Sequence, residues 1–115
     1  MLNRILGHNV TFNEFIEAAK SGGDAGLATV NQYIQQNQNN VLAINAVGQY
    51  GNTALICAAD NGHTAIVTAL LARINNVNEL RHENNNHRTA VQEAERNGKH
   101  EVVALIRVKG STIGF

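Results

Sequence analysis

The stretch that decides the fold is YGNTALICAADNGHTAIVTALL, residues 50–71. Its apolar residues follow a helical period on both sides of Gly62, which predicts two short antiparallel helices joined at that glycine. Three residues of this stretch return 36 positions later in the chain: Thr53, Gly62 and Val67 recur as Thr89, Gly98 and Val103. One supersecondary unit is therefore used more than once, and the chain is a small repeat array.

The same residues resemble the ankyrin repeat, whose pattern is G-x-T-P-L-H-x-A-A-x-x-G-H-x-x-[VI]-V-x-x-L-L. Ala54 replaces the Pro of this pattern and Ile56 replaces its His. The matching positions are Gly51, Thr53, Leu55, Ala58, Ala59, Gly62, His63, Val67, Leu70 and Leu71. The resemblance implies an all-α solenoid of about three helix-turn-helix units linked by hairpin-like loops. It also implies a non-catalytic protein-binding scaffold, in which His63 bonds to the backbone between helices.

We expect a single domain over residues 1–115, divided into four parts. They are a degenerate opening unit (1–44), a full repeat (45–77), a closing unit (78–108) and a tail (109–115). The tail, KGSTIGF, shows no period, so we expect it to fray or to pack loosely. Its apolar ending could alternatively be a recognition tag for a secretion or sorting machine.

Helix signals are clear in the opening and closing units. Thr11 with Glu14, and Thr89 with Gln92, predict capping boxes at the start of a helix. Gly22 predicts a left-handed stop for the first helix. The second helix of the opening unit is expected over residues 27–35, followed by a polar loop, QQNQNN.

The spacing of the asparagines predicts a longer second hairpin loop. Asn45 recurs as Asn78 after 33 residues, whereas Thr53 recurs as Thr89 after 36. We therefore expect three extra residues, at 84–86, in the second loop. Such an insertion is either a place for functional residues or a tolerated change without consequence.

Two charged residues predict the end of the array. Glu95 stands where the full repeat has Ala59, and Arg107 stands where it has Leu71. Because an unpaired buried charge is costly, both side chains should face water. A terminal repeat needs such a polar outer face, so no further repeat is expected to follow.

Composition excludes several partner classes. Nine basic and nine acidic residues give a net charge of zero, which argues against nucleic acid and anionic membrane as main partners. The single cysteine, Cys57, favours a reducing, cytoplasmic compartment. We expect neither a signal peptide in MLNRILGHNV nor a transmembrane span. The Asn-rich, Pro-free repeats resemble those of bacterial ankyrin proteins, some of which are delivered into host cells as effectors.

No pattern in the sequence indicates catalysis, so we expect no enzyme activity, no cofactor and no metal. His82 and His87 lie close in sequence, but the ligand set of a structural zinc site is missing. Cys57 lies within a helix that packing should bury, which makes its thiol inert. A metal- or ligand-binding enzyme fragment is the alternative, and it would require an ion held by His82 or His87.

The partner-binding surface is expected on the loop tips and the exposed ends of the first helices, which line a concave face. The candidate residues are Lys20, Ser21, Gln49, Tyr50, Asn52, Asp60, Asn61, His87, Arg88, Arg96 and Asn97. Tyr50 and Arg88 are the leading anchors, because Tyr and Arg are enriched in interface hot spots. Tyr50 could instead pack back onto the neighbouring loop. The Asn-rich residues 84–86 would form an adjustable rim.

The binding area of two loops is small, which implies modest affinity or a homo-oligomer that enlarges the site. The alternative function is a regulatory or inhibitory subunit that covers the active site of another protein.

Overall fold

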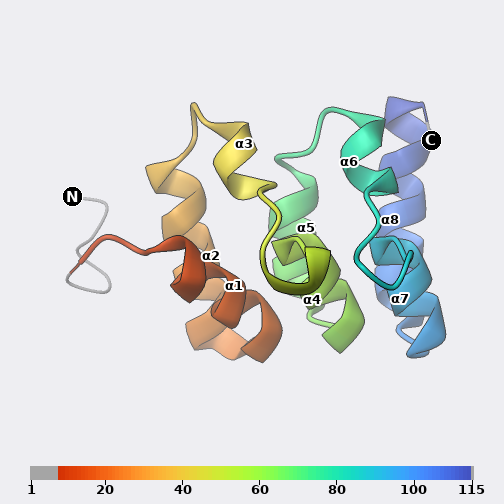
Figure 1. Cartoon of the computed structure of the whole chain (residues 1–115), viewed down its shortest axis with the longest axis horizontal. Coiled ribbons are helices and arrows are strands. Elements are labelled where there is room, and N and C mark those ends of the chain that lie inside the picture. The colour runs from red at the N-terminus through yellow and green to blue at the C-terminus, as the bar shows by residue number, and fades with distance from the viewer. Residues whose placement is uncertain (1–7, 115) are drawn as a thin grey trace.

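The computed structural model describes residues 8–114, and within this range it contains helices and no strand (Figure 1). The elements are α1 (Phe12–Ser21), α2 (Gly23–Gln36), α3 (Val41–Ile44), η2 (Gln49–Gly51), α4 (Ala54–Asn61), α5 (Thr64–Leu71), α6 (Val77–Arg81), α7 (Ala90–Arg96) and α8 (His100–Ile113). The expected all-α, helix-turn-helix solenoid is confirmed.

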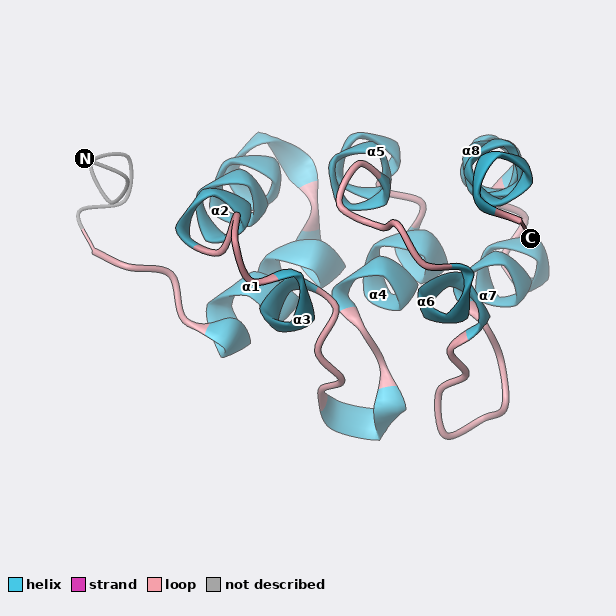
Figure 2. Cartoon of the chain, turned by 90° about the horizontal axis from the view of Figure 1, so that it is seen from above, coloured by secondary structure: helices cyan, strands magenta, loops and turns pink. Residues whose placement is uncertain are grey.

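The long helices form three antiparallel pairs that stack side by side in two rows (Figure 2). Helices α1, α4 and α7 form the inner row, and α2, α5 and α8 form the outer row. Two loops extend on the side of the inner row, which Figure 2 shows clearly. We name residues 46–52 the first finger and residues 82–88 the second finger. Short helices α3 and α6 precede the two fingers.

Small side chains let the inner helices approach one another. Ala19 of α1, Ala58 and Ala59 of α4, and Ala94 of α7 are fully buried, and α4 contacts both α1 and α7. The remaining core is mainly aliphatic, as the composition indicates. In the opening unit the rings of Phe15 and Tyr33 stack with their centroids 4.1 Å apart.

The helix starts and turns confirm the local signals of the sequence. Thr11 Oγ1 accepts a hydrogen bond from the Glu14 N–H (3.2 Å), and Glu14 Oε1 accepts one from the Thr11 N–H (2.9 Å). Thr89 and Gln92 form the equivalent capping box before α7. Gly62 ends α4 in the left-handed conformation, with φ 71° and ψ 29°.

Two expectations about helix extent are wrong, and one short helix was not expected. Helix α2 begins at Gly23 rather than at residue 27, because the residues GDAG form its first turn. Residues 109–113 do not fray: they continue α8, with Gly110 buried and Ile113 packed against the core. Helix α3 occupies residues that carried no helix signal in the sequence, and Ile44 at its end is buried.

The fingers have equal length, so the expected insertion at residues 84–86 is wrong. Positions 36 residues apart are structurally equivalent in the two fingers and the helices that flank them. Ile44 and Leu80 are equivalent buried residues, and Thr53 and Thr89 are equivalent helix caps. The bond that closes each loop is also equivalent: it runs from the Gly48 N–H to Asn52 O (2.7 Å) in the first finger and from the Asn84 N–H to Arg88 O (3.0 Å) in the second. The 33-residue match of Asn45 with Asn78 joins positions that are not equivalent.

An extended segment covers part of α2 in the opening unit. The side-chain amide of Gln36 accepts a bond from the Val10 N–H (2.7 Å) and donates one to Val10 O (3.0 Å). Gln32 donates to His8 O (2.8 Å). The side chains of two glutamines of α2 thus bond to the backbone of residues 8–10 in the way that the backbone of a neighbouring strand would. Nothing in the sequence indicated these contacts.

The closing face is charged, as expected. Glu95 and Arg107 are both exposed and form an ion pair with each other. The two substitutions that replace apolar residues of the full repeat therefore compensate one another on a surface that faces water.

A histidine joins the first two repeats. His63 Nε2 donates to the carbonyl oxygen of Lys20 (2.7 Å), which confirms the role that the family resemblance implies. The ring lies directly against Gly22, where an added Cβ would be 2.3 Å from His63 Nδ1. Gly22 has φ 69° and ψ −154°, so it has a positive φ but not the expected left-handed helical conformation.

Gly22→Ala tests the contact between Gly22 and the His63 ring, and Gly98→Ala is the control. At Gly98 (φ 69°) an added Cβ would meet no atom within 4 Å, so that variant should lose only about 1 kcal/mol from backbone strain. Gly22→Ala should lose at least about 1 kcal/mol more, because the new Cβ displaces His63 from its hydrogen bond and because a ψ of −154° at this positive φ is essentially restricted to glycine. Urea unfolding followed by circular dichroism measures both, and equal losses would contradict the contact.

Candidate functional site

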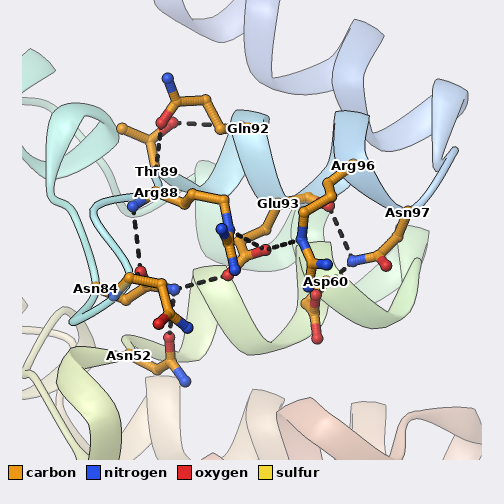
Figure 3. A network of polar contacts seen from close by, with 10 residues as sticks. Asn52, Asp60, Asn84, Arg88, Thr89, Gln92, Glu93, Arg96 and Asn97 are labelled. Carbon is orange, nitrogen blue, oxygen red and sulfur yellow. Dashed lines mark hydrogen bonds and ion pairs between the residues drawn. The ribbon is translucent and has the colours of Figure 1, made fainter.

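The base of the second finger is a buried polar network centred on Asn84 (Figure 3). Asn84 is only 6% exposed. Its Nδ2 donates to Asn52 Oδ1 (3.1 Å) and to Glu93 Oε2 (2.7 Å), while its Oδ1 accepts from the N–H of Asn86 (2.9 Å) and of Arg88 (3.2 Å). Asn84 is therefore a structural residue, and the expectation that it belongs to an adjustable rim is wrong.

Glu93 is the acidic centre of this network. Its side chain is buried, and Oε1 accepts hydrogen bonds from Arg88 Nε (3.0 Å) and Arg96 Nε (3.1 Å). Burial by itself would raise the pKa of Glu93, but hydrogen bonds from Asn84, Arg96 and Arg88 outweigh it. The pKa lies below the ordinary value of 4.5, so the carboxylate is ionised at neutral pH.

Several expected partner-binding residues are held in bonds within the chain. Asn52, Arg88 and Arg96 belong to the Asn84–Glu93 network. Asn97 Nδ2 donates to Asp60 and so connects α7 to α4. These five residues lie along the inner row and at the base of the fingers, where they hold two repeats together (Figure 3).

The other expected partner-binding residues are more open. Gln49, Tyr50, Asn61, His87 and Ser21 are exposed. Lys20 is half-buried, and its Nζ lies 3.3 Å from Glu17 Oε2. The expected partner-binding residues therefore fall into two groups: side chains that are exposed to solvent and side chains that already bond to other residues of the chain.

Two hollows lie along the inner row. One, of about 120 Å³, lies between α1, α4 and α7 and is lined by Lys20, Asn52, Ile56, Cys57, Asp60, Asn61 and Glu93. The other, of about 370 Å³, lies between α1 and the first finger and is lined by Phe12, Asn13, Ile16, Glu17, Lys20, Gly48 and Gln49. Both are open and partly polar, which suits contact with side chains of another protein.

Tyr50 combines exposure with a costly backbone conformation. Its side chain is 64% exposed, so the alternative that it packs onto the neighbouring finger is wrong. Its φ of 62° is in the left-handed region that bulky residues rarely adopt. The backbone is nevertheless tied down, because the Asn85 N–H donates to Tyr50 O (2.9 Å) and His82 Nε2 donates to Gly51 O (2.8 Å).

The described residues offer binding groups rather than a reactive centre. Cys57 is buried, and burial raises the pKa of its thiol to about 11, so the thiol stays protonated at neutral pH. Within residues 8–114, no three His, Cys, Asp or Glu side chains gather as metal ligands would. His82 is bonded to Gly51 O, whereas the exposed His87 lies 3.9 Å from Glu83.

A family model described as ankyrin repeats (3 copies) matches residues 15–114. The chain belongs to the ankyrin-repeat family. This fold is a non-catalytic one whose members are generally protein–protein interaction modules. Neither a curated protein nor a solved structure matches the chain. Of the helices that the structure describes, none has the length and apolar character needed to cross a membrane.

Two exposed apolar residues of this ankyrin array were not predicted from the sequence. Leu42 is 81% exposed and Val47 is 53% exposed. Tyr50 is 64% exposed, and we name the three exposed residues Leu42, Val47 and Tyr50, which lie within nine residues of sequence, the apolar strip. The equivalent residues 36 positions later are polar: Asn78, Glu83 and Asn86. A comparison of the two units at the correct 36-residue spacing would have found this contrast.

Glu93→Gln tests the network of the ankyrin array. The variant keeps the shape of Glu93 but removes its charge, and we expect a loss of about 1–3 kcal/mol at pH 7. Because the folded pKa is below 4.5, the stabilisation is complete above the ordinary carboxyl pKa and is lost as pH falls through the folded value. The difference between the two proteins should therefore shrink in acid.

Urea unfolding at several pH values measures this difference. Glu95→Gln is the matched control, because Glu95 is exposed with a single arginine partner. It should change the free energy of unfolding by less than about 1 kcal/mol. A Glu93→Gln loss that is equally small, or that is independent of pH, would contradict the role of the carboxylate.

Tyr50→Asn tests the strain in the first finger. Asn tolerates a positive φ better than Tyr, so the free energy of unfolding should rise by about 0.5–1 kcal/mol. Gln49→Asn, at the neighbouring exposed position, should stay within about 0.5 kcal/mol of the parent protein. A loss of stability in Tyr50→Asn would mean that the phenol ring packs in the folded chain.

Proposed function

We propose that this ankyrin array is a non-catalytic interaction module that binds a protein partner through its first finger. The apolar strip makes the central contact. The observation that supports this most directly is the contrast between the two units. Three large apolar residues are exposed at and before the first finger, and polar residues occupy the three equivalent positions of the next unit.

The exposed apolar residues are concentrated in one segment of the chain. The described residues contain four exposed large hydrophobic side chains, and three of them lie within residues 42–50. Val108, on α8, is the fourth. Single exposed apolar residues are ordinary, but a local group of them favours a contact surface.

The strain at Tyr50 supports the same proposal. A residue with a positive φ costs free energy, and an exposed ring regains none of it through packing in the free protein. Tyr supplies a large contact area with little loss of side-chain entropy when it binds. Tyr50 is therefore placed for a partner that covers it.

The polar candidates surround this central contact. Gln49 and Lys20 line the hollow between α1 and the first finger, and Asn61 lines the hollow between α1, α4 and α7. In the proposed interface they form a polar rim with Ser21 and His87. The area available is small, so affinity is modest unless two copies of the chain bind together.

The finer functional alternatives depend on the partner. A regulatory or inhibitory subunit, or a bacterial effector delivered into a host cell, would use the same surface against an enzyme. We assign the interaction to a reducing compartment such as the cytoplasm, which the single buried thiol of Cys57 supports. Inhibition of a partner's catalytic activity by the purified array would identify the inhibitory role.

The first experiment identifies the partner by contact. A photo-crosslinking amino acid is placed at position 50 and, as a control, at position 108. A protein that is crosslinked from position 50 and not from position 108 is then purified, and its dissociation constant for the array is measured.

Substitutions that copy the second unit test the strip. Leu42→Asn, Val47→Glu and Tyr50→Asn each introduce the residue found 36 positions later. Combined, they should weaken binding at least about tenfold, because the buried apolar area is lost. Val108→Asn, a matched change at the other exposed site, should leave the dissociation constant unchanged. Equal effects of the two changes would contradict the proposed surface.

A further inference from the structure

We propose that Arg88 and Arg96 together receive a carboxylate side chain of the protein partner. This inference rests on the proposed function and adds the chemistry of the partner: a segment with apolar residues for the strip and an acidic residue for the two arginines. The partner's carboxylate would be the second one to bind these two guanidinium groups, because the buried carboxylate of Glu93 already holds both.

The charges of this group do not balance. Arg88 and Arg96 both bond to Glu93 Oε1, at 3.0 and 3.1 Å, so their Nε atoms are at most about 6 Å apart. Neither arginine forms an ion pair with any other carboxylate between residues 8 and 114. Two positive charges therefore share one negative charge, and a second carboxylate would reduce their mutual repulsion.

The geometry leaves the arginines accessible from outside. The side chain of Glu93 is 6% exposed, whereas those of Arg88 and Arg96 are 32% and 55% exposed. The carboxylate thus lies beneath the guanidinium groups and holds each of them by its Nε. A guanidinium is a planar fork of five N–H donors, so donors remain for a second carboxylate that approaches from solvent.

The nearest acidic side chain on α4 does not fill this role. Asp60 accepts a hydrogen bond from Asn97 and forms no ion pair with Arg96. Its negative charge, with that of Glu17 beside Lys20, makes the rest of the inner row a poor surface for a polyanion. The site therefore suits one acidic side chain on a protein rather than the phosphates of a nucleic acid.

The second finger, which Arg88 ends, contacts the first finger at Tyr50. The Asn85 N–H of the second finger bonds to Tyr50 O of the first (2.9 Å), and Arg88 ends the second finger. A partner segment that covers Tyr50 and continues across the second finger would bring its next side chains to Arg88 and Arg96. Charge recognition there would add specificity and salt sensitivity to apolar contact.

The test uses the isolated protein, so it does not depend on the identity of the partner. Tetraglutamate, with blocked ends, is titrated into labelled protein at low salt while the arginine Nε–H signals are followed by NMR. We expect the signals of Arg88 and Arg96 to shift together, and the effect to fade as salt is added. Tetraglutamine should shift neither signal.

Arg81 is the matched control. It is exposed on α6 and forms no ion pair within the described part of the chain. Arg96→Gln should weaken tetraglutamate binding at least fivefold, whereas Arg81→Gln should leave it unchanged. Arg88→Gln provides a second variant if Arg96→Gln alters the fold.

Three results would overturn this inference. Arg81 signals that shift as much as those of Arg88 and Arg96 would show general attraction to positive charge. Tighter binding of inorganic phosphate or of a DNA oligonucleotide than of tetraglutamate would show that the two arginines prefer phosphate to carboxylate. An absence of shifts would show that Glu93 already satisfies both arginines. None of these results bears on the apolar strip, which the variants at residues 42, 47 and 50 test separately.

Discussion

The buried carboxylate of Glu93 is the interaction on which the arrangement of the two fingers depends. It occupies the position that Cys57 occupies in the preceding repeat, where an apolar side chain would ordinarily pack. A charge there is stable only if it is fully hydrogen-bonded, and Asn84, Arg88 and Arg96 supply the donors. Because Asn84 also bonds to Asn52, this one carboxylate joins α7, the second finger and the first finger.

This network gives the two fingers different roles. The second finger directs Asn84 and Arg88 inward, to Glu93, and presents polar side chains to solvent. The first finger is supported from behind by the Asn85–Tyr50 and His82–Gly51 bonds and presents its apolar side chains outward. A rigid support allows Tyr50 to keep a strained backbone conformation, and a contact surface held in this way loses little entropy when a partner binds.

The sequence predicted what local signals encode. The capping residues Thr11 and Thr89 and the turn at Gly62 act through bonds between near neighbours, so their pattern is readable. The finger lengths were misjudged because Asn45 and Asn78 are identical but not equivalent. The extension of α8 depends on burial of Gly110 and Ile113 against the core, which no local pattern records. The candidate site could be predicted only in part: its finger positions follow from the repeat, whereas the bonds of Arg88 to Glu93 and the exposure of Leu42 require the tertiary structure.

The central claim is that the first finger, and not the closing end, meets the partner. Hydrogen exchange of the protein, free and in complex with the partner crosslinked from position 50, tests it most directly. The account predicts that backbone amides of residues 42–50 gain protection in the complex, while those of α8 around Val108 keep the exchange rates of the free protein. Protection concentrated on α8, with residues 42–50 unchanged, would contradict it.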